Sequence, residues 1–129
     1  MATELESQLR SILARHPEVR LAYLFGSLAR DRARTSSDID IAVLADSPLS
    51  AETKTAIIGE IAETTGRPVD LVDIATAGEP LLGEVLKGRR LLGSATLHGD
   101  LLSRHLIDAA DFGPYQARIL KERRDAWTQ

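Results

Sequence analysis

The sequence predicts an α/β fold in which a small sheet is flanked by helices and followed by a helical C-terminal tail. Three apolar runs with the length of buried strands alternate with segments of helical periodicity. Beyond residue 96 the pattern stays helical. A chain of 129 residues is long enough to bury a core. We therefore expect residues 1–129 to form a single domain, with its core region over about residues 19–92 and its tail over about residues 96–127.

The apolar pattern near the N-terminus predicts a helix and then a strand. Residues 4–16 carry leucine and isoleucine at helical spacing, and Pro17 ends the helix. Residues 19–25 are almost entirely apolar, as in a strand buried on both faces. Gly26 ends this strand, and Ser27 is placed to cap a short helix that continues to about Arg32.

The middle of the chain predicts a second strand over residues 38–44, then a helix and a third strand. Ser50 is a typical N-cap for the helix, which continues to about Thr65. Gly66 stands where a C-cap glycine is expected. The apolar run at residues 69–74 is the predicted third strand.

The last third of the chain is mainly helical. A helix over about residues 80–87 is ended by Gly88, and residues 89–92 form a short edge strand. A longer helix begins near Thr96, is interrupted at residues 113–114, and is followed by a last helix over about residues 115–126.

Composition excludes several kinds of chemistry. The chain has no cysteine, which excludes disulfides, thiolate nucleophiles and cysteine-ligated zinc. A net charge of -3 gives no general electrostatic reason to bind nucleic acid, so we expect no direct nucleic-acid contact. Residues 1–20 are too charged for a secretory signal and no apolar run could span a bilayer, so we expect a cytoplasmic location without membrane contact. We interpret His98 and His105 as helix surface.

Asp38 and Asp40 are candidate metal ligands at the start of the second strand. Alternate strand residues share a face, so these two carboxylates point the same way while Ile39, Ile41 and Val43 point into the core. Two carboxylates held this close repel each other, and hard cations such as Mg²⁺ would relieve the repulsion. The simpler interpretation is a pair of surface residues at a strand end.

A third carboxylate would complete a two-metal site, and Asp70 and Asp73 compete for that position. They have opposite parity in the third strand, so only one of them can face the metals. We favour Asp70, because Val69 and Leu71 flank it and an unpaired carboxylate deep in a strand would be costly to bury.

Gly26 and Ser27 have the character of a phosphate-binding turn. Glycine allows a phosphate to approach the backbone closely, and the free N–H groups of a following helix attract anions. Ser27 adds a hydroxyl donor, and Arg30, one turn further on, is a candidate phosphate ligand. Alternatively, Ser27 is only an N-cap and Arg30 only a solvated helix residue.

Residues 24–30 (Leu-Phe-Gly-Ser-Leu-Ala-Arg) and 37–40 (Ser-Asp-Ile-Asp) resemble the signature of the polymerase-β-like nucleotidyltransferases. The short chain resembles the minimal nucleotidyltransferase (MNT) group, and residues 69–73 are similar to the strand with that group's third carboxylate. Residues 86–92 are similar to the helix, glycine and short strand that follow it. The resemblance covers roughly residues 19–92 and implies the polymerase-β-like fold, with a small mixed sheet.

The resemblance implies transfer of a nucleoside monophosphate, most simply AMP from ATP, to a hydroxyl with release of pyrophosphate. It implies that the catalytic residues, which also bind two Mg²⁺ ions, are Asp38, Asp40 and Asp70. It implies that the nucleotide-binding residues are Gly26, Ser27, Arg30 and Ser37.

The resemblance also implies a partner. Minimal members are often antitoxins of HEPN-domain ribonuclease toxins, which they adenylylate on a tyrosine, so we expect a hetero-oligomer with such a toxin. Two alternatives stay open: an antitoxin that neutralises by binding alone, and a nucleotidyltransferase with a small-molecule acceptor. One departure is Asp31, which stands where the family usually has glycine and brings a negative charge near the triphosphate.

Overall fold

The computed structural model of the chain describes residues 4–26 and 38–114, with side chains described as far as residue 107. It divides into two compact units, Met1–His98 and Gly99–Gln129. The described elements, in chain order, are α1 (Glu4–Ala14), β1 (Val19–Phe25), β2 (Ile39–Ala45), α2 (Ala51–Thr65), β3 (Val69–Asp73), the 3-10 turn η2 (Ile74–Thr76), α3 (Leu81–Leu86), β4 (Arg89–Leu92) and α4 (Ala95–Pro114).

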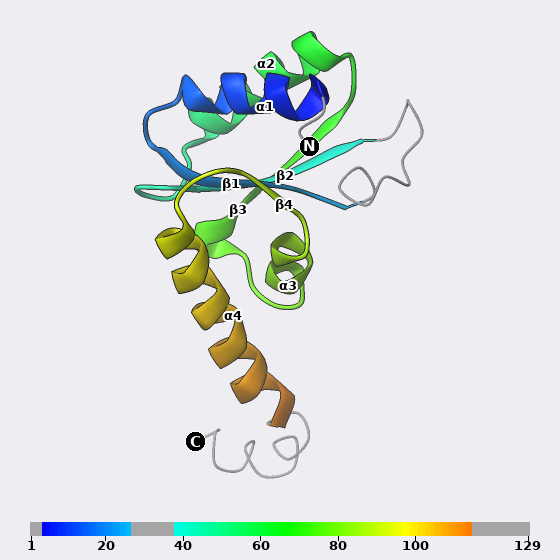
Figure 1. The fold of residues 1–129 in the computed structure, drawn as a ribbon. Coiled ribbons are helices and arrows are strands. Elements are labelled where there is room, and N and C mark those ends of the chain that lie inside the picture. The colour runs from blue at the N-terminus through cyan, green and yellow to red at the C-terminus, as the bar shows by residue number, and fades with distance from the viewer. Residues whose placement is uncertain (1–3, 27–37, 115–129) are drawn as a thin grey trace. The chain divides into compact units, whose positions relative to one another are not determined.

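The first unit is built on a four-stranded mixed sheet with the strand order β3-β2-β1-β4. Strand β1 is antiparallel to both β2 and β4, whereas β2 and β3 are parallel. Helices α1 and α2 cover one face of this sheet and α3 lies on the other face (Figure 1). The expected α/β architecture is therefore confirmed, including the short edge strand over residues 89–92.

The ends of α2 are fixed by the two caps that the sequence predicts. The Ser50 hydroxyl oxygen accepts a hydrogen bond from the Thr53 backbone N–H at 3.1 Å. At the other end Gly66 is left-handed, with φ 71°, and its N–H donates to the Ala62 carbonyl. These local contacts set where α2 begins and ends, and therefore where β3 can start.

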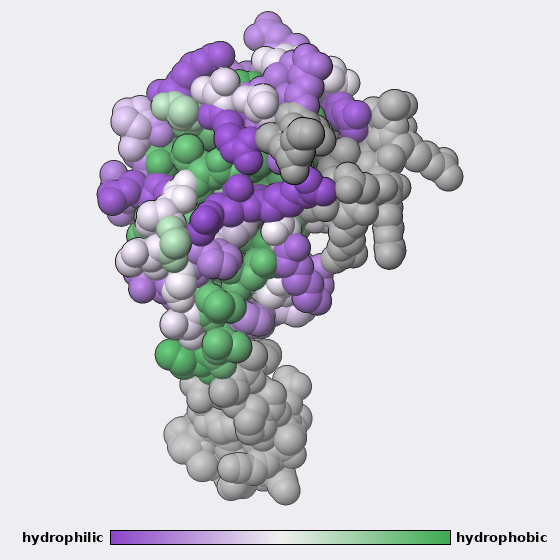
Figure 2. Space-filling model, viewed as in Figure 1, coloured by the Kyte–Doolittle hydropathy of each residue, from purple (hydrophilic) through white to green (hydrophobic). Residues whose placement is uncertain are grey.

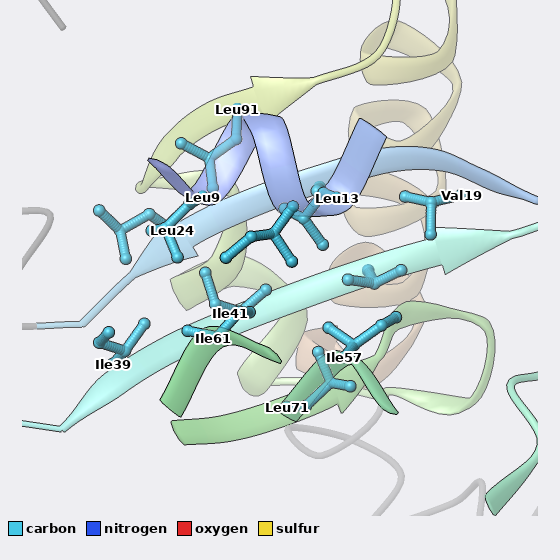
Figure 3. Close-up of a cluster of buried hydrophobic side chains, with 13 residues drawn as sticks. Leu9, Leu13, Val19, Leu24, Ile39, Ile41, Ile57, Ile61, Leu71 and Leu91 are labelled. Carbon is cyan, nitrogen blue, oxygen red and sulfur yellow. The ribbon is translucent and has the colours of Figure 1, made fainter. Parts of the chain in front are cut away.

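The main hydrophobic core lies between the sheet and the pair α1 and α2. Every second residue of β2 faces this layer, as expected for Ile39, Ile41 and Val43, which are fully buried. Figure 3 shows Ile39 and Ile41 in one cluster with side chains of α1 and α2. The labelled members of this cluster are Leu9, Leu13, Val19, Leu24, Ile39, Ile41, Ile57, Ile61, Leu71 and Leu91.

The opposite face of the sheet is covered by α3. Tyr23, Phe25 and Ala42 are buried there, and so are Leu82 and Val85 of α3, which packs against β1. Asp40 has the same strand parity as Ala42, so its carboxylate belongs to this α3 face. The main core lies on the α1 and α2 face, so the carboxylate of Asp40 stands on the opposite face, at the start of β2.

An ion-pair cluster ties the edge strand β4 to α1. Glu6 is buried, and its carboxylate accepts a hydrogen bond from Arg89 at 3.0 Å. Arg10, one turn further along α1, donates from Nε to the Leu91 carbonyl at 2.9 Å. Charged partners make this burial tolerable, and they hold β4 in place beside β1.

The second unit begins within α4, whose backbone continues to Pro114. The predicted final helix over residues 115–126 lies outside the described residues. No helix within the described ranges is both long enough and apolar enough to cross a membrane.

Two glycine substitutions test the packing of this fold. At Gly88 a Cβ atom would overlap the Leu24 carbonyl oxygen and the Phe25 backbone, whereas at Gly59 in α2 the space is open. We expect Gly88→Ala to lower the free energy of unfolding by about 1–3 kcal/mol through overpacking. Gly59→Ala should instead raise it by up to about 1 kcal/mol, because alanine is the better helix former. Urea denaturation of both variants measures this, and equal stability of Gly88→Ala and wild type would contradict the close packing.

Candidate active site

Two carboxylates meet where the parallel strands β2 and β3 begin. The register of this pair places Asp40 directly beside Asp70, so both side chains lie on the α3 face of the sheet. Asp40 is partly buried, and Asp70 is exposed. Asp38, two residues before Asp40, is also exposed and lies just outside the strand.

Asp40 is held in a negatively charged and partly buried environment. Burial raises the pKa of Asp40 above its ordinary value, and the negative charges of Asp70 and then Asp38 raise this pKa further. Both of these neighbouring charges are negative. A cation bound at this end of the sheet would therefore relieve the repulsion among the carboxylates.

The donor set suits a hard divalent cation, because carboxylate oxygens are the ligands that Mg²⁺ prefers. Among the side chains of the described ranges, however, no three acidic, histidine or cysteine groups stand close enough to hold an ion. An ion placed here would need further oxygen ligands, and the phosphate groups of a substrate supply such ligands in many phosphoryl-transfer sites.

Gly26 follows β1 and lies against the carboxylate of Asp40. Its φ of 77° falls in the left-handed region that favours glycine. A Cβ atom added here would overlap the Oδ2 atom of Asp40. The sequence indicates Gly26 for the approach of a phosphate, and the structure adds a second reason, which is room for the Asp40 carboxylate.

Asp73, the competing third carboxylate, has a different set of contacts. Its Oδ2 accepts a hydrogen bond from the Leu49 N–H at 2.9 Å, and its Oδ1 accepts one from the Ala75 N–H at 3.1 Å. Its register partner is Val43, whose side chain lies in the main core layer. Asp73 thus joins the loop before α2 to the end of β3.

The burial argument that favoured Asp70 over Asp73 is wrong. Asp70 is exposed, because it stands on the outer strand β3, whereas Asp73 is the more buried of the two. What places Asp70 beside Asp40 is the parallel register of two neighbouring strands, and burial of Asp70 contributes nothing to it.

Several predicted site residues fall outside the described residues. These are Ser27, Arg30 and Ser37, together with Asp31 and the short helix expected from Ser27 to about Arg32. Their roles stay predictions from the sequence.

Comparison with known proteins identifies the family. The family model described as "Polymerase beta, Nucleotidyltransferase" matches residues 7–96, which is more than half of the chain. The chain belongs to this nucleotidyltransferase family. The matched range includes Gly26 and all three carboxylates of the candidate site.

A curated relative is the protein adenylyltransferase MntA of Shewanella oneidensis, which is 37% identical over 79 residues. The aligned stretch covers 60% of this chain and 57% of that protein, so it spans little more than half of the relative's length.

Two solved structures show the same fold. A chain in the crystal structure of a toxin–antitoxin complex with AMP-PNP is 28% identical, with a TM-score of 0.78, over 88% of this chain and 94% of that one. A chain in the structure of a tri-AMPylated Shewanella oneidensis HEPN toxin with its MNT antitoxin is 27% identical. There the TM-score is 0.62, with 96% of this chain and 93% of that one covered.

One hydrogen bond on the α3 face of the sheet is not predicted by the sequence. The Tyr23 hydroxyl and the Nδ1 atom of His98 are 2.5 Å apart, so His98 is not simply helix surface. Burial raises the pKa of the Tyr23 hydroxyl, and the nearby Arg90 charge partly offsets this shift. No sequence signal links these residues, because 75 positions separate them.

The raised pKa of Asp40 predicts how stability depends on pH. A carboxyl group whose pKa is higher in the folded state than in the unfolded state destabilises the fold once pH exceeds the folded pKa. Asp40→Asn removes this penalty, so its melting temperature should exceed that of wild type at neutral pH. The gain should vanish as pH falls to the ordinary aspartate range. A variant no more stable than wild type at pH 7, or one whose gain persists in acid, would contradict the raised pKa of Asp40.

Proposed function

We propose that this chain is a Mg²⁺-dependent nucleotidyltransferase that moves AMP from ATP to a tyrosine hydroxyl of a HEPN-domain toxin and so acts as an antitoxin. The observation that carries the proposal is the register of Asp40 with Asp70, next to Gly26 at the end of β1. Similarity to an adenylyltransferase and to a chain in a complex with AMP-PNP supports the nucleotide. Because ATP is a cytoplasmic substrate, we place the activity in the cytoplasm.

Different residues of the site bind the phosphates and the metal ions. Gly26 and Ser27 hold the terminal phosphates through backbone N–H groups and the hydroxyl, with Arg30 and Ser37 as further nucleotide ligands. Asp38, Asp40 and Asp70, whose charges act together at Asp40, would hold two Mg²⁺ ions. Bound Mg²⁺ would neutralise the charge that develops on the phosphoryl oxygens.

Asp70 is the residue placed to act on the acceptor. As the outermost and most accessible of the paired carboxylates, it accepts the proton of the attacking hydroxyl. The hydroxyl oxygen then forms a bond to the α-phosphorus of ATP, the bond between that phosphorus and the bridging oxygen breaks, and pyrophosphate leaves.

The toxin partner has support in the second unit. Within the described part of α4, Leu102, Leu106 and Ile107 are exposed, and Figure 2 shows apolar surface gathered on this helix. One of the similar chains comes from a complex of an MNT antitoxin with a HEPN toxin.

Transfer assays with two matched aspartate variants test this function. Purified chain, HEPN toxin, ATP and Mg²⁺ are combined, and the intact mass of the toxin is followed. We expect wild type to add AMP, and Asp70→Asn to slow the addition by about a hundredfold or more, as for loss of a general base. Asp73→Asn should keep most of the rate but melt at a lower temperature, because it loses a hydrogen-bonded cap.

Three outcomes would contradict the assignment. An unmodified toxin that is nevertheless neutralised would favour the alternative of an antitoxin that acts by binding alone. An inactive Asp73→Asn with an active Asp70→Asn would exchange the two aspartates. A toxin that is neither modified nor neutralised, alongside AMP addition to a small hydroxyl compound, would favour the small-molecule acceptor.

A further inference from the structure

The turn between α3 and β4 packs directly on the last residues of β1. At Gly88 an added Cβ atom would overlap the Leu24 carbonyl oxygen and the Cα and Cβ atoms of Phe25. Leu24 is also the register partner of Arg89 in the antiparallel pair of β1 and β4. The backbone of this turn therefore touches the strand end that leads into Gly26.

The contact of Gly88 with β1 places Lys87 at the same end of the strand as Gly26. Because Leu24 faces Arg89, one step along an antiparallel ladder brings Phe25 to Gly88, and the Gly88 packing shows that they do meet. Gly26 follows Phe25 and Lys87 precedes Gly88, so both residues directly adjoin this contact. Lys87 is the C-cap residue of α3, and the turn that it opens packs on the end of β1, one residue before the glycine that lies against the Asp40 carboxylate.

Lys87 is also the basic residue of this turn that is held least firmly. Its side chain is 69% exposed, and its Nζ lies 3.6 Å from Glu84 of the same helix, in an exposed pair of the kind that contributes little to stability. Its neighbour Arg89 is engaged by the buried Glu6, and Arg90 donates to the Ser94 carbonyl. A flexible four-carbon stem lets the Lys87 ammonium group turn from Glu84 to a stronger anion.

The strand order gives the direction of the reaction across the sheet. In the order β3-β2-β1-β4, Asp70 lies to one side of Asp40, whereas Gly26 and Lys87 lie to the other side. Phosphoryl transfer needs the attacking and the leaving oxygen roughly in line on opposite sides of the phosphorus. With the acceptor at Asp70 and the α-phosphorus at Asp40, the leaving group extends toward Lys87.

We propose that Lys87 binds the β- and γ-phosphates of the nucleotide and the pyrophosphate that leaves. This inference rests on the proposed nucleotidyltransferase function and adds a cation from the α3–β4 turn to the phosphate-binding site. Lys87 would bring a positive charge to the side on which pyrophosphate leaves, whereas Asp38, Asp40 and Asp70 are acidic.

Binding measurements separate this role from a structural one. Calorimetric titrations with AMP-PNP, inorganic pyrophosphate and AMP, each with Mg²⁺, are compared for wild type, Lys87→Gln and Lys87→Arg. Lys54→Gln is the matched control, since Lys54 lies on α2 and α2 covers the opposite face of the sheet. We expect Lys87→Gln to weaken AMP-PNP and pyrophosphate binding about tenfold, with AMP affinity unchanged, as for loss of one charged hydrogen bond.

Lys87→Arg should keep most of the affinity, and Lys54→Gln should match wild type for all three ligands. If Lys87→Gln binds AMP-PNP as tightly as wild type, or loses AMP affinity to the same degree, the assignment of Lys87 is wrong while the proposed function stands. If wild type itself fails to bind AMP-PNP with Mg²⁺, both the assignment and the proposed function are overturned.

Discussion

The parallel pairing of β2 with β3 is the constraint on which the candidate site depends. It sets Asp40 beside Asp70, and the resulting repulsion adds to the raised pKa of Asp40. This arrangement is unfavourable by itself, and it persists because the opposite face of the same strands is held by the core. Ile39 and Ile41 of β2, and Leu71 of β3, are buried there beneath α1 and α2. A slip of one residue would turn these apolar side chains out of the core.

The remaining site features depend on the same geometry. Gly26 is next to Asp40 because β1 ends where β2 begins, with Phe25 as the register partner of Asp40. Strand β4 then brings the α3–β4 turn to that end of β1, and the buried Glu6 fixes β4 through Arg89. Asp40 and Asp70 thus come from β2 and β3, Gly26 from the end of β1, and Lys87 from the turn between α3 and β4. In the proposed transfer, the strand order places the acceptor on one side of Asp40 and the leaving group on the other.

Local patterns predicted most of the secondary structure, because their causes are local. The caps at Ser50 and Gly66 and the alternation of Ile39, Ile41 and Val43 follow from neighbouring residues and are confirmed. The order of the strands in the sheet does not follow from local sequence patterns. The sequence favours Asp70 through an expected burial, and the exposed Asp70 side chain contradicts that burial. The sequence does not show that β3 is an edge strand. The Tyr23–His98 and Glu6–Arg89 contacts join distant segments and had no sequence signal.

The number of divalent ions bound with nucleotide shows whether the paired carboxylates form a metal site. Mn²⁺ in place of Mg²⁺ allows bound ions to be counted by electron paramagnetic resonance in the presence of AMP-PNP. Wild type should bind two Mn²⁺ ions per chain, as in two-metal phosphoryl-transfer sites, and Asp40→Asn should lose at least one of them. Equal Mn²⁺ binding by the two proteins, or none by wild type, would contradict the account.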